Sequence, residues 1–322
     1  MRKAILLLCA SLANAAIPLG YTGGATSGGT GGKSISVTDP TYNGGDSSVC
    51  SGSSHDDRSA IQTTLNYASA NSIPTVTMPA TTCYMNSYAH VAGVTSNLQM
   101  PNGVTLQGTT GSSKILETSS GRPTCTSLCT VTVINVGTFL VTWSKMGCPS
   151  SGACTGYYPL NTPTVGSNVV TLTNSFQGSL FHIGDYITIY DHQPQAEDDV
   201  INGFQSIITN VSGATITLAD NMARSSATSY IGNLSTGLTQ GIAHIGHDIG
   251  LKGVIVQGAC PILMTESFNV TLQNNQFIAE TDLYDSTHQY IAVGQWNSIE
   301  HYTFDRNQFI SIGTNGIVGR WR

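Results

Sequence analysis

Charged residues are scarce in this sequence: only 9% of its 322 residues are Asp, Glu, Lys or Arg. The 12 Lys and Arg residues form no basic block that could neutralise phosphates, so we expect no binding of nucleic acid. A hydrophobic fraction of 40% argues against wholesale disorder, because disordered chains combine few apolar residues with high net charge. The motifs of serine hydrolases, nucleotide-binding proteins and zinc proteases are missing as well, so the sequence gives these classes no support.

The abundant residues are Thr, Ser, Gly, Asn, Val and Ile, and glycine alone occurs 35 times. This mixture suits strands and tight turns and is poor in strong helix formers. We therefore expect a mostly β protein, long enough to form one large domain or two small ones.

The N-terminus has the pattern of an export signal. Arg2 and Lys3 precede a short apolar run, residues 4–12, and an Ala-x-Ala cleavage signature at residues 13–15. The run is too short to span a bilayer as a helix, and no later segment is apolar enough to do so. We predict a signal peptide over residues 1–15 and a secreted protein, extracellular or periplasmic, without a membrane span.

Seven of the eight cysteines would remain after cleavage, and in an oxidising compartment cysteines usually pair. Cys50 and Cys83 flank a predicted helix and could bridge around it. Cys260 is left over, and we expect a buried thiol in a core strand. Four others lie in one loop-rich stretch and could form disulfides, which we favour, or a four-thiolate zinc site: Cys125, Cys129, Cys148 and Cys154.

The first firm element of the chain is a helix. Asp56 or Asp57 can cap it, and its apolar face consists of Ile61, Leu65 and Ala68. Residues 16–55, which precede it, are rich in Gly, Ser and Thr and predict a flexible lead-in.

A family resemblance becomes visible in three consecutive segments: residues 56–62 (DDRSAIQ), 75–84 (TVTMPATTCY) and 98–108 (LQMPNGVTLQG). Together they resemble the N-terminal part of the pectate-lyase-like superfamily, which includes rhamnogalacturonase-like proteins, uronan epimerases and phage tailspikes. The turn at 79–84 is one residue longer than the P-x-G-x-Y turn of the family and lacks its glycine. The resemblance implies a parallel β-helix capped by the helix, with polysaccharide bound in a groove along one outward face.

We accordingly predict an all-β fold: a right-handed parallel β-helix over residues 56–322 with an N-terminal capping helix. Alternating strands joined by a hairpin at Ser212-Gly213 indicate a small antiparallel β insertion at 160–222. The chain stops directly after a strand with no visible cap, so we expect either a fragment or a partner that covers that end.

A weak internal repeat from residue 250 onward is typical of successive coils. Residues 269–277 (NVTLQNNQF) recur as residues 301–309 (HYTFDRNQF). Two pairs at matching positions should form an amide ladder and an aromatic stack in the core: Asn275 with Asn307, and Phe277 with Phe309.

The best candidate site is the loop at 280–288, which lengthens one coil: Val270 to Tyr302 spans 32 residues, against 16 from Val254 to Val270. Hydrolysis of a glycoside needs two carboxylates, whereas elimination from a uronate needs its carboxylate neutralised, often by Ca²⁺, and a base. The loop carries groups suited to either reaction: Glu280, Asp282, Tyr284, Asp285 and His288. Within it, Asp282 and Asp285 are candidate Ca²⁺ ligands, and a merely solvated loop is the alternative.

A second candidate set comes from aligning the strands of successive coils. The alignment places Glu266, Gln295 and Arg320 in one stacked row, next to Trp296 and Trp321. Aromatic faces pack on sugar rings, so this row suits sugar binding, with Glu266 and Arg320 as further catalytic candidates. The alternative is a structural polar ladder.

Two weaker sets remain. His244, His247 and Asp248 could bind a metal ion, or they could form a turn before the first clear coil. The carboxylates at 197–199 could hold a ligand or Ca²⁺, or could be an exposed acidic loop.

The predicted function is that of a secreted carbohydrate-active enzyme, a lyase or glycoside hydrolase acting on an acidic polysaccharide such as pectin or another uronan. The first alternative is a non-catalytic glycan-binding, adhesin or tailspike-like protein. The second is a purely structural repeat protein. An enzyme would have a close carboxylate pair or a Ca²⁺ cluster on one face, and a binding protein would have aromatic residues without such a pair. The sugar, the linkage and the oligomeric state stay open.

Overall fold

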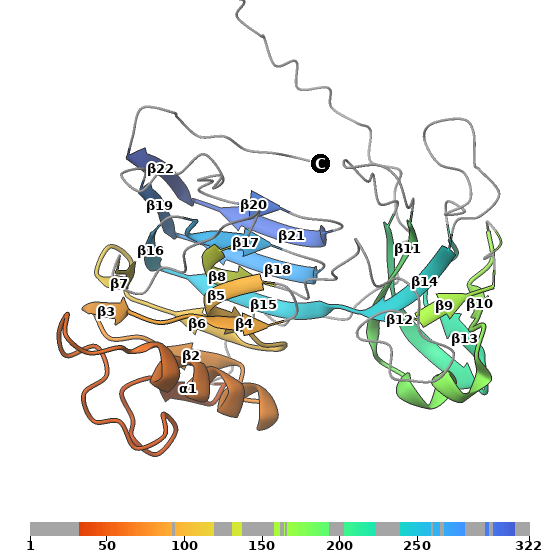
Figure 1. Cartoon of the computed structure of the whole chain (residues 1–322), viewed down its shortest axis with the longest axis horizontal. Helices are drawn as coiled ribbons and strands as arrows, with labels where there is room; N and C mark the ends of the chain where they lie inside the picture. Colours follow the sequence, from red (N-terminus) through yellow and green to blue (C-terminus); the bar gives the residue numbers. More distant parts are fainter. Residues whose placement is uncertain are drawn as a thin grey trace, which may run out of the picture. The chain divides into compact units, whose positions relative to one another are not determined.

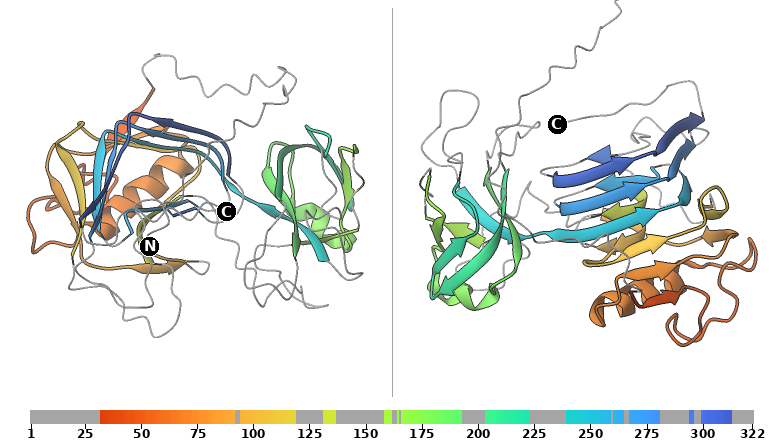
Figure 2. Two further views of the ribbon diagram at one scale, coloured as in Figure 1. Left: turned by 90° about the horizontal axis from the view of Figure 1, so that it is seen from above. Right: turned by 180° about the vertical axis from the view of Figure 1, so that it is seen from behind.

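Three β-sheets wind around a common interior in the computed structural model (Figures 1 and 2). The structure describes residues 32–91, 94–118, 131–136, 158–161, 164, 166–192, 203–222, 239–258, 260–264, 267–280, 294–295 and 299–312. No helix in these ranges is long and apolar enough to cross a membrane.

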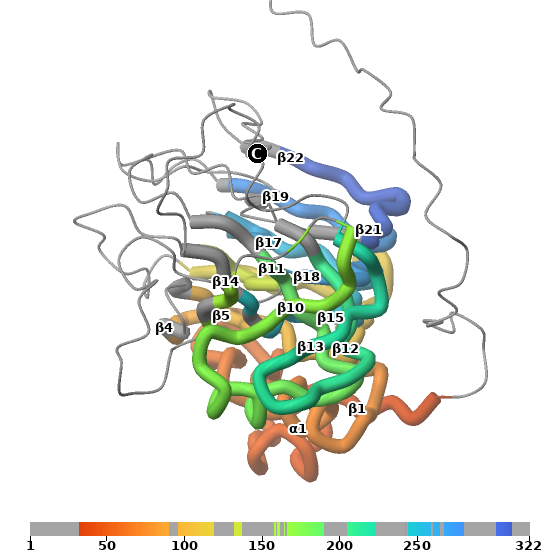
Figure 3. Tube along the Cα trace, turned by 90° about the vertical axis from the view of Figure 1, so that its right-hand side faces the viewer, coloured from red at the N-terminus to blue at the C-terminus, as the bar shows by residue number. Residues whose placement is uncertain are grey.

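The three coils that begin at β6, β15 and β18 place one strand in each sheet, and the coils follow one another along the chain to β22 (Figure 3). Sheet A contains β1 (Ser34–Ser36), β2 (Thr75–Thr77), β6 (Thr105–Gln107), β15 (Gly246–Lys252), β18 (Ser267–Gln273) and β21 (Ile299–Asp305). Sheet B contains β3 (Thr82–Met85), β7 (Ser113–Glu117), β16 (Val254–Gly258), β19 (Gln276–Glu280) and β22 (Gln308–Ile312). Sheet C contains β4 (Ala89–Val91), β5 (Val94–Met100), β8 (Val131–Val136), β17 (Ile262–Met264) and β20 (Gly294–Gln295).

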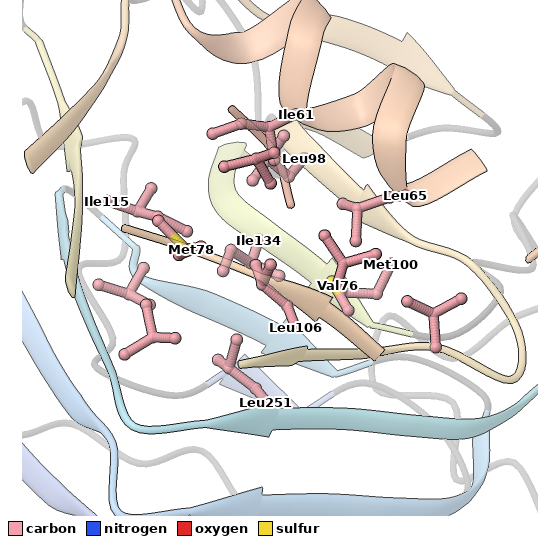
Figure 4. Close-up of a cluster of buried hydrophobic side chains, with 14 of the residues drawn as sticks. Ile61, Leu65, Val76, Met78, Leu98, Met100, Leu106, Ile115, Ile134 and Leu251 are labelled. Atoms are coloured by element: carbon pink, nitrogen blue, oxygen red, sulfur yellow. The ribbon is translucent and has the colours of Figure 1, made fainter. Parts of the chain in front are cut away.

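Strand pairing in these sheets is parallel except for the hairpin of β4 and β5. The predicted right-handed parallel β-helix is therefore confirmed. Side chains alternate between the interior and the surface, as the pleat of a strand requires. Val76, Leu106 and Leu251 of sheet A meet Ile115 of sheet B and Ile134 of sheet C in the interior (Figure 4).

The helix α1 (Arg58–Ala70) covers the first coil, as predicted. It buries Ile61 and Leu65 against the core (Figure 4). The Gln62 side chain continues the hydrogen bonding of β5, because its Oε1 accepts from the Gln99 backbone N–H and its Nε2 donates to the Gln99 carbonyl. The helix thus satisfies backbone groups that a strand at the end of a solenoid would leave open.

The predicted flexible lead-in is wrong from β1 onward. This strand pairs in parallel with β2 and forms the first rung of sheet A. Ile35, Val37 and Val49 are buried in the main core. The Cys50–Cys83 disulfide, which the sequence allowed, joins this segment to β3. Cys260 is buried, as expected.

Asp57 holds the same segment in place. It occupies the N-cap position of α1, but its side chain caps no helix N–H. Its fully buried carboxylate instead accepts hydrogen bonds from the backbone N–H groups of Cys50 (2.7 Å) and Tyr84 (2.6 Å). His55 completes the arrangement: its Nδ1 lies 2.7 Å from Asp57 Oδ1 and its Nε2 3.1 Å from Asp46 Oδ2.

The predicted ladders are confirmed in coils three to five. Asn275 is buried, and its Oδ1 accepts from the Val254 N–H while its Nδ2 donates to the Leu251 carbonyl and to Asn307 Oδ1. The rings of Phe277 and Phe309 stack with their centroids 5.5 Å apart. Phe277 is fully buried but Phe309 is 38% exposed, so the predicted aromatic stack forms and only its Phe277 half lies in the core.

The predicted coil length of 16 residues is wrong. Val254 belongs to sheet B and Val270 to sheet A, so they are not equivalent positions. Val270 instead lies beside Ile249, 21 positions earlier, and beside Tyr302, 32 positions later. The coil that contains the loop at 280–288 is still the longer one.

The antiparallel insertion is confirmed and is larger than predicted. Its sheet has the order β10-β13-β12-β11-β14-β9 and its own hydrophobic core. Two of its strands lie outside the predicted range of 160–222, because β9 begins at Tyr158 and β14 ends at His244. Its elements are β9 (Tyr158–Leu160), β10 (Val169–Thr171), the 3-10 helix η2 (Ser175–Leu180), β11 (Tyr186–His192), β12 (Gly203–Ser212), β13 (Thr215–Leu218) and β14 (Thr239–His244).

Titration of His55 should make stability depend on pH. The hydrogen bond to Asp57 raises the pKa of His55 above its ordinary value of 6.5, and the negative charge of Asp46 adds to this effect. A group whose pKa is raised in the folded state contributes stability that is fully present below its pKa in the unfolded state. This contribution is lost as the pH rises through its pKa in the folded state. We expect the free energy of unfolding of the wild type to fall above pH 6.5 relative to His55→Gln, as measured by urea unfolding at several pH values.

His182→Gln is the matched control for this effect, because 75% of the His182 side chain is exposed. If the wild type and His55→Gln lost stability with the same slope over this pH range, the His55 contacts would have no such role.

Candidate functional site

Histidines, carboxylates and aromatic rings of the described residues gather where the insertion joins the β-helix. Only Ile245 separates β14 from β15 (Figure 1), and its backbone N–H donates to the Tyr186 carbonyl on β11. This pairing brings Asp185 and Tyr186 next to His244 and His247, about 60 residues further along the chain.

Four partly or fully exposed rings form a row at this junction, which we term the ring row: Tyr186, His247, Phe268 and His301. The Tyr186 and His247 rings stack, with centroids 4.1 Å apart and planes 10° apart. Phe268 lies 5.3 Å from Tyr186 and 4.4 Å from His301, again between ring centroids. The row therefore joins one strand of the insertion to three successive coils.

A repeated backbone turn underlies the row. Asp248, Asn269 and His301 occupy matching positions in β15, β18 and β21, and each has a φ between 54° and 56°. Residues other than glycine rarely adopt this left-handed backbone conformation, and among them Asn and Asp tolerate it best. The Asn269 side chain donates to Asp248 Oδ1, which ties two of these turns together.

His244 and His247 each have their own carboxylate. His247 Nδ1 lies 2.9 Å from Asp248 Oδ2, and His244 Nε2 lies 2.9 Å from Asp185 Oδ2. The His247 hydrogen bond is the main cause of a lowered pKa for Asp248, and bonds from Asn269 and Tyr186 add to it, although partial burial acts in the opposite direction. Asp248 is therefore ionised at neutral pH, and it orients the imidazole with Nε2 as the remaining ring nitrogen.

Of the two interpretations of His244, His247 and Asp248, the metal site is not supported. Their ligand atoms do not converge, because the two histidines pair with different carboxylates. Within the described ranges, the one group of three potential ligands close enough to share an ion is Cys50, Asp57 and Cys83.

The outer surface of sheet A continues from the ring row along the same strands, and we term it the polar face. Two columns of outward residues cross its strands in register. The first column is Ser34, Thr75, Thr105, Gly250, Thr271 and Thr303. The second column is Ser36, Thr77, Gln107, Lys252, Gln273 and Asp305.

Two positions of the polar face stand out. Gly250 interrupts the hydroxyl column, because a side chain there would collide with Thr105. Lys252 is the one cation of the two columns, and it forms no ion pair with another described residue, whereas Asp305 binds Gln273 and Arg306. Lys252 therefore has no acidic partner among the residues that the structure describes.

Sequence reasoning did not find Tyr186, Phe268 or Lys252. One signal was present: the triplet Thr-Leu-Gln occurs at 105–107 and again at 271–273, with polar residues on both sides of a buried one. Tyr186 had no such signal, since only strand pairing within the insertion brings it to the junction.

The predicted alignment of Gln295 with Glu266 is wrong. β17 and β20 pair Leu263 with Gly294 and Met264 with Gln295, so Gln295 is not opposite Glu266. Glu280, the first residue of the predicted loop, is the last residue of β19. The other predicted site residues lie outside the described ranges: Glu266, Asp282, Tyr284, Asp285, His288, Trp296, Arg320 and Trp321, together with the carboxylates at 197–199 and the cysteines at 125, 129, 148 and 154.

The sequence matches no protein-family model and no curated protein. Among solved structures, it is similar to the tailspike gp61 of Pseudomonas phage phi297, with 13% identity and a TM-score of 0.42 over 70% of this chain and 32% of that one. The gp54 tailspike of Acinetobacter baumannii bacteriophage AP22, in complex with A. baumannii capsular saccharide, gives 11% identity and a TM-score of 0.41 over 77% of this chain and 38% of that one. The A-module of the Azotobacter vinelandii mannuronan C-5 epimerase AlgE4 gives 12% identity and a TM-score of 0.29 over 85% of this chain and 51% of that one.

The chain thus spans about a third of the length of these tailspikes. At this level of identity and superposition the likeness says nothing about a ligand or a reaction. Any functional conclusion depends on the residues of this chain.

Proposed function

We propose that the protein binds an acidic polysaccharide across sheet A, from the ring row over the polar face. The observation that carries this proposal is the ring row itself, in which Tyr186 and His247 stack and Phe268 and His301 extend the row over successive coils. Partly exposed rings offer flat apolar faces to the C–H groups of sugar rings, while their polar atoms remain available for hydrogen bonds.

The polar face supplies the complementary polar contacts. Threonine hydroxyls and glutamine amides both donate and accept hydrogen bonds, as sugar hydroxyls do. Because neighbouring strands lie about 4.8 Å apart, the same groups recur at a spacing close to one sugar unit of an extended chain. A polymer that runs across the strands would therefore meet similar hydroxyl and amide groups on several coils, apart from Gly250, Lys252 and Asp305.

The charge of Lys252 favours an acidic polymer over a neutral one. Lys252 lies between Gln107 and Gln273 in the second column. A uronate carboxylate bound there would meet a cation that no described acidic residue already neutralises.

Several sequence-based predictions remain proposals under this function. Secretion is supported by the Cys50–Cys83 disulfide, because disulfides persist mainly outside the reducing cytosol. Asp282 and Asp285 remain candidate Ca²⁺ ligands, and Trp296 and Trp321 remain candidate sugar-binding residues.

A second candidate function is cleavage of the bound polymer. The observation that favours it is the His247–Asp248 pair, since an imidazole held by a carboxylate can take up a proton at its other nitrogen. In a lyase this proton would come from C5 of a uronate.

Cleavage would appear as ultraviolet absorbance of unsaturated uronate that rises together with new reducing ends. We expect His247→Ala to reduce this rate at least 100-fold, the usual contribution of a general base. Reducing ends without the absorbance would indicate hydrolysis instead, and the absence of both in a folded protein that binds the polymer would leave binding as the sole function.

The binding proposal predicts a charge-specific effect at Lys252. We expect Lys252→Gln to weaken binding of an oligouronate about tenfold, or ~1.4 kcal/mol, and to reduce the dependence of affinity on salt. Isothermal titration calorimetry with acidic and neutral oligosaccharides of equal length measures both effects.

Lys114→Gln is the matched control for charge, because Lys114 lies on sheet B. Tyr186→Ala should weaken the same binding, with Tyr67→Ala on α1 as its control. The proposal is wrong if the folded protein binds none of the acidic oligosaccharides.

A further inference from the structure

A cluster distant in sequence from the junction combines two sulfur atoms with a carboxylate and an imidazole. The ligand atoms of Cys50, Asp57 and Cys83 lie within 4.8 Å of one another, and all three residues are buried. His55 adjoins them, since its Nδ1 is 2.7 Å from Asp57 Oδ1. In the structure the two sulfur atoms form a disulfide.

The disulfide is not the only bond that holds the two cysteines together. Asp57 binds the backbone N–H of Cys50 itself and that of Tyr84, the residue after Cys83. Cys83 is also fixed by its strand, which pairs with β7 opposite Ile115. These hydrogen bonds do not depend on the sulfur–sulfur bond, so the two thiols would remain neighbours after its reduction.

The carboxylate of Asp57 has room for one more partner. An ionised carboxylate offers about four lone-pair positions. Three are used in the structure, by the N–H groups of Cys50 and Tyr84 and by the His55 ring. The fourth lies on Oδ2, which accepts from Tyr84 alone among the described residues.

We propose that reduction of the Cys50–Cys83 disulfide converts this cluster into a binding site for Zn²⁺. Three ligands, the two thiolates and an Asp57 oxygen, come from atoms that already lie within 4.8 Å of one another. His55, which contacts Asp57 but lies outside this group, would move toward it to complete a tetrahedral set of four. A dithiol is the reductant: it supplies two electrons and two protons, the sulfur–sulfur bond breaks to give two thiols, and the dithiol becomes a cyclic disulfide. Zn²⁺ then displaces the protons of both thiols.

The bound ion would take over the structural role of the disulfide. It would again link residues 32–55 to the first coil, through Cys50 and Cys83. This site is independent of the polysaccharide surface proposed above.

Cobalt(II) is the probe, because cobalt bound by thiolates in a tetrahedral site gives intense visible and near-ultraviolet absorption. The whole protein is reduced with dithiothreitol, freed of it without oxygen and titrated with Co²⁺, with Zn²⁺ as competitor. We expect one equivalent of thiolate-bound cobalt in the reduced wild type that is missing from the oxidised protein and from Cys83→Ser. Cys260→Ser is the control and should bind as the wild type does.

The difference between the wild type and Cys83→Ser excludes any contribution of the remaining cysteines. Equal cobalt stoichiometry and spectra for these two reduced proteins would overturn the proposal. If circular dichroism shows that Cys83→Ser does not fold, His55→Gln becomes the deciding variant, since it keeps both cysteines. We expect it to lose at least tenfold in affinity for Co²⁺. An unchanged affinity would overturn the proposed ligand set.

Discussion

Each coil of this β-helix must place its residues directly on those of the coil before it. Parallel pairing imposes this constraint, because every backbone N–H and carbonyl of a strand needs a partner in the next coil. The consequence is that a residue type suited to one position is repeated along a column. Asn275 and Asn307 form such a column in the interior, and the threonines of sheet A form one on the surface. The same constraint aligns the left-handed turns at Asp248, Asn269 and His301, and with them the ring row.

Local patterns in the sequence were sufficient to predict the helix, the disulfide and the stacked pairs of the core. These features depend on residues that are close in sequence or that recur in a similar context. The coil length was predicted wrongly, because Val254 and Val270 are both apolar residues in short strands and nothing in the sequence assigns a strand to sheet A or sheet B. The lead-in was misjudged for a related reason: its glycines and serines resemble a linker, yet Ile35, Val37 and Val49 are enough to bury it.

The candidate site was harder to predict than the fold. Tyr186 and His247 are about 60 residues apart, and they meet only because β11 pairs with β14 and β14 leads into β15. Sequence reasoning singled out His247 and Asp248 but left a metal site and a turn open, since nothing in the sequence shows that His244 binds Asp185. Lys252 could not be recognised either, because its significance lies in the uncharged residues beside it on neighbouring coils. The insertion is therefore part of the site: it supplies one ring of the row and the carboxylate that holds His244.

The central claim is that an acidic polysaccharide lies across the strands of sheet A, between the ring row and Lys252. A crystal structure of the protein with a bound oligouronate tests it most directly. The account predicts a sugar ring against Tyr186 or Phe268 and a uronate carboxylate within hydrogen-bonding distance of Lys252. An oligouronate bound on the outer surface of sheet B or sheet C, with sheet A empty, would contradict it.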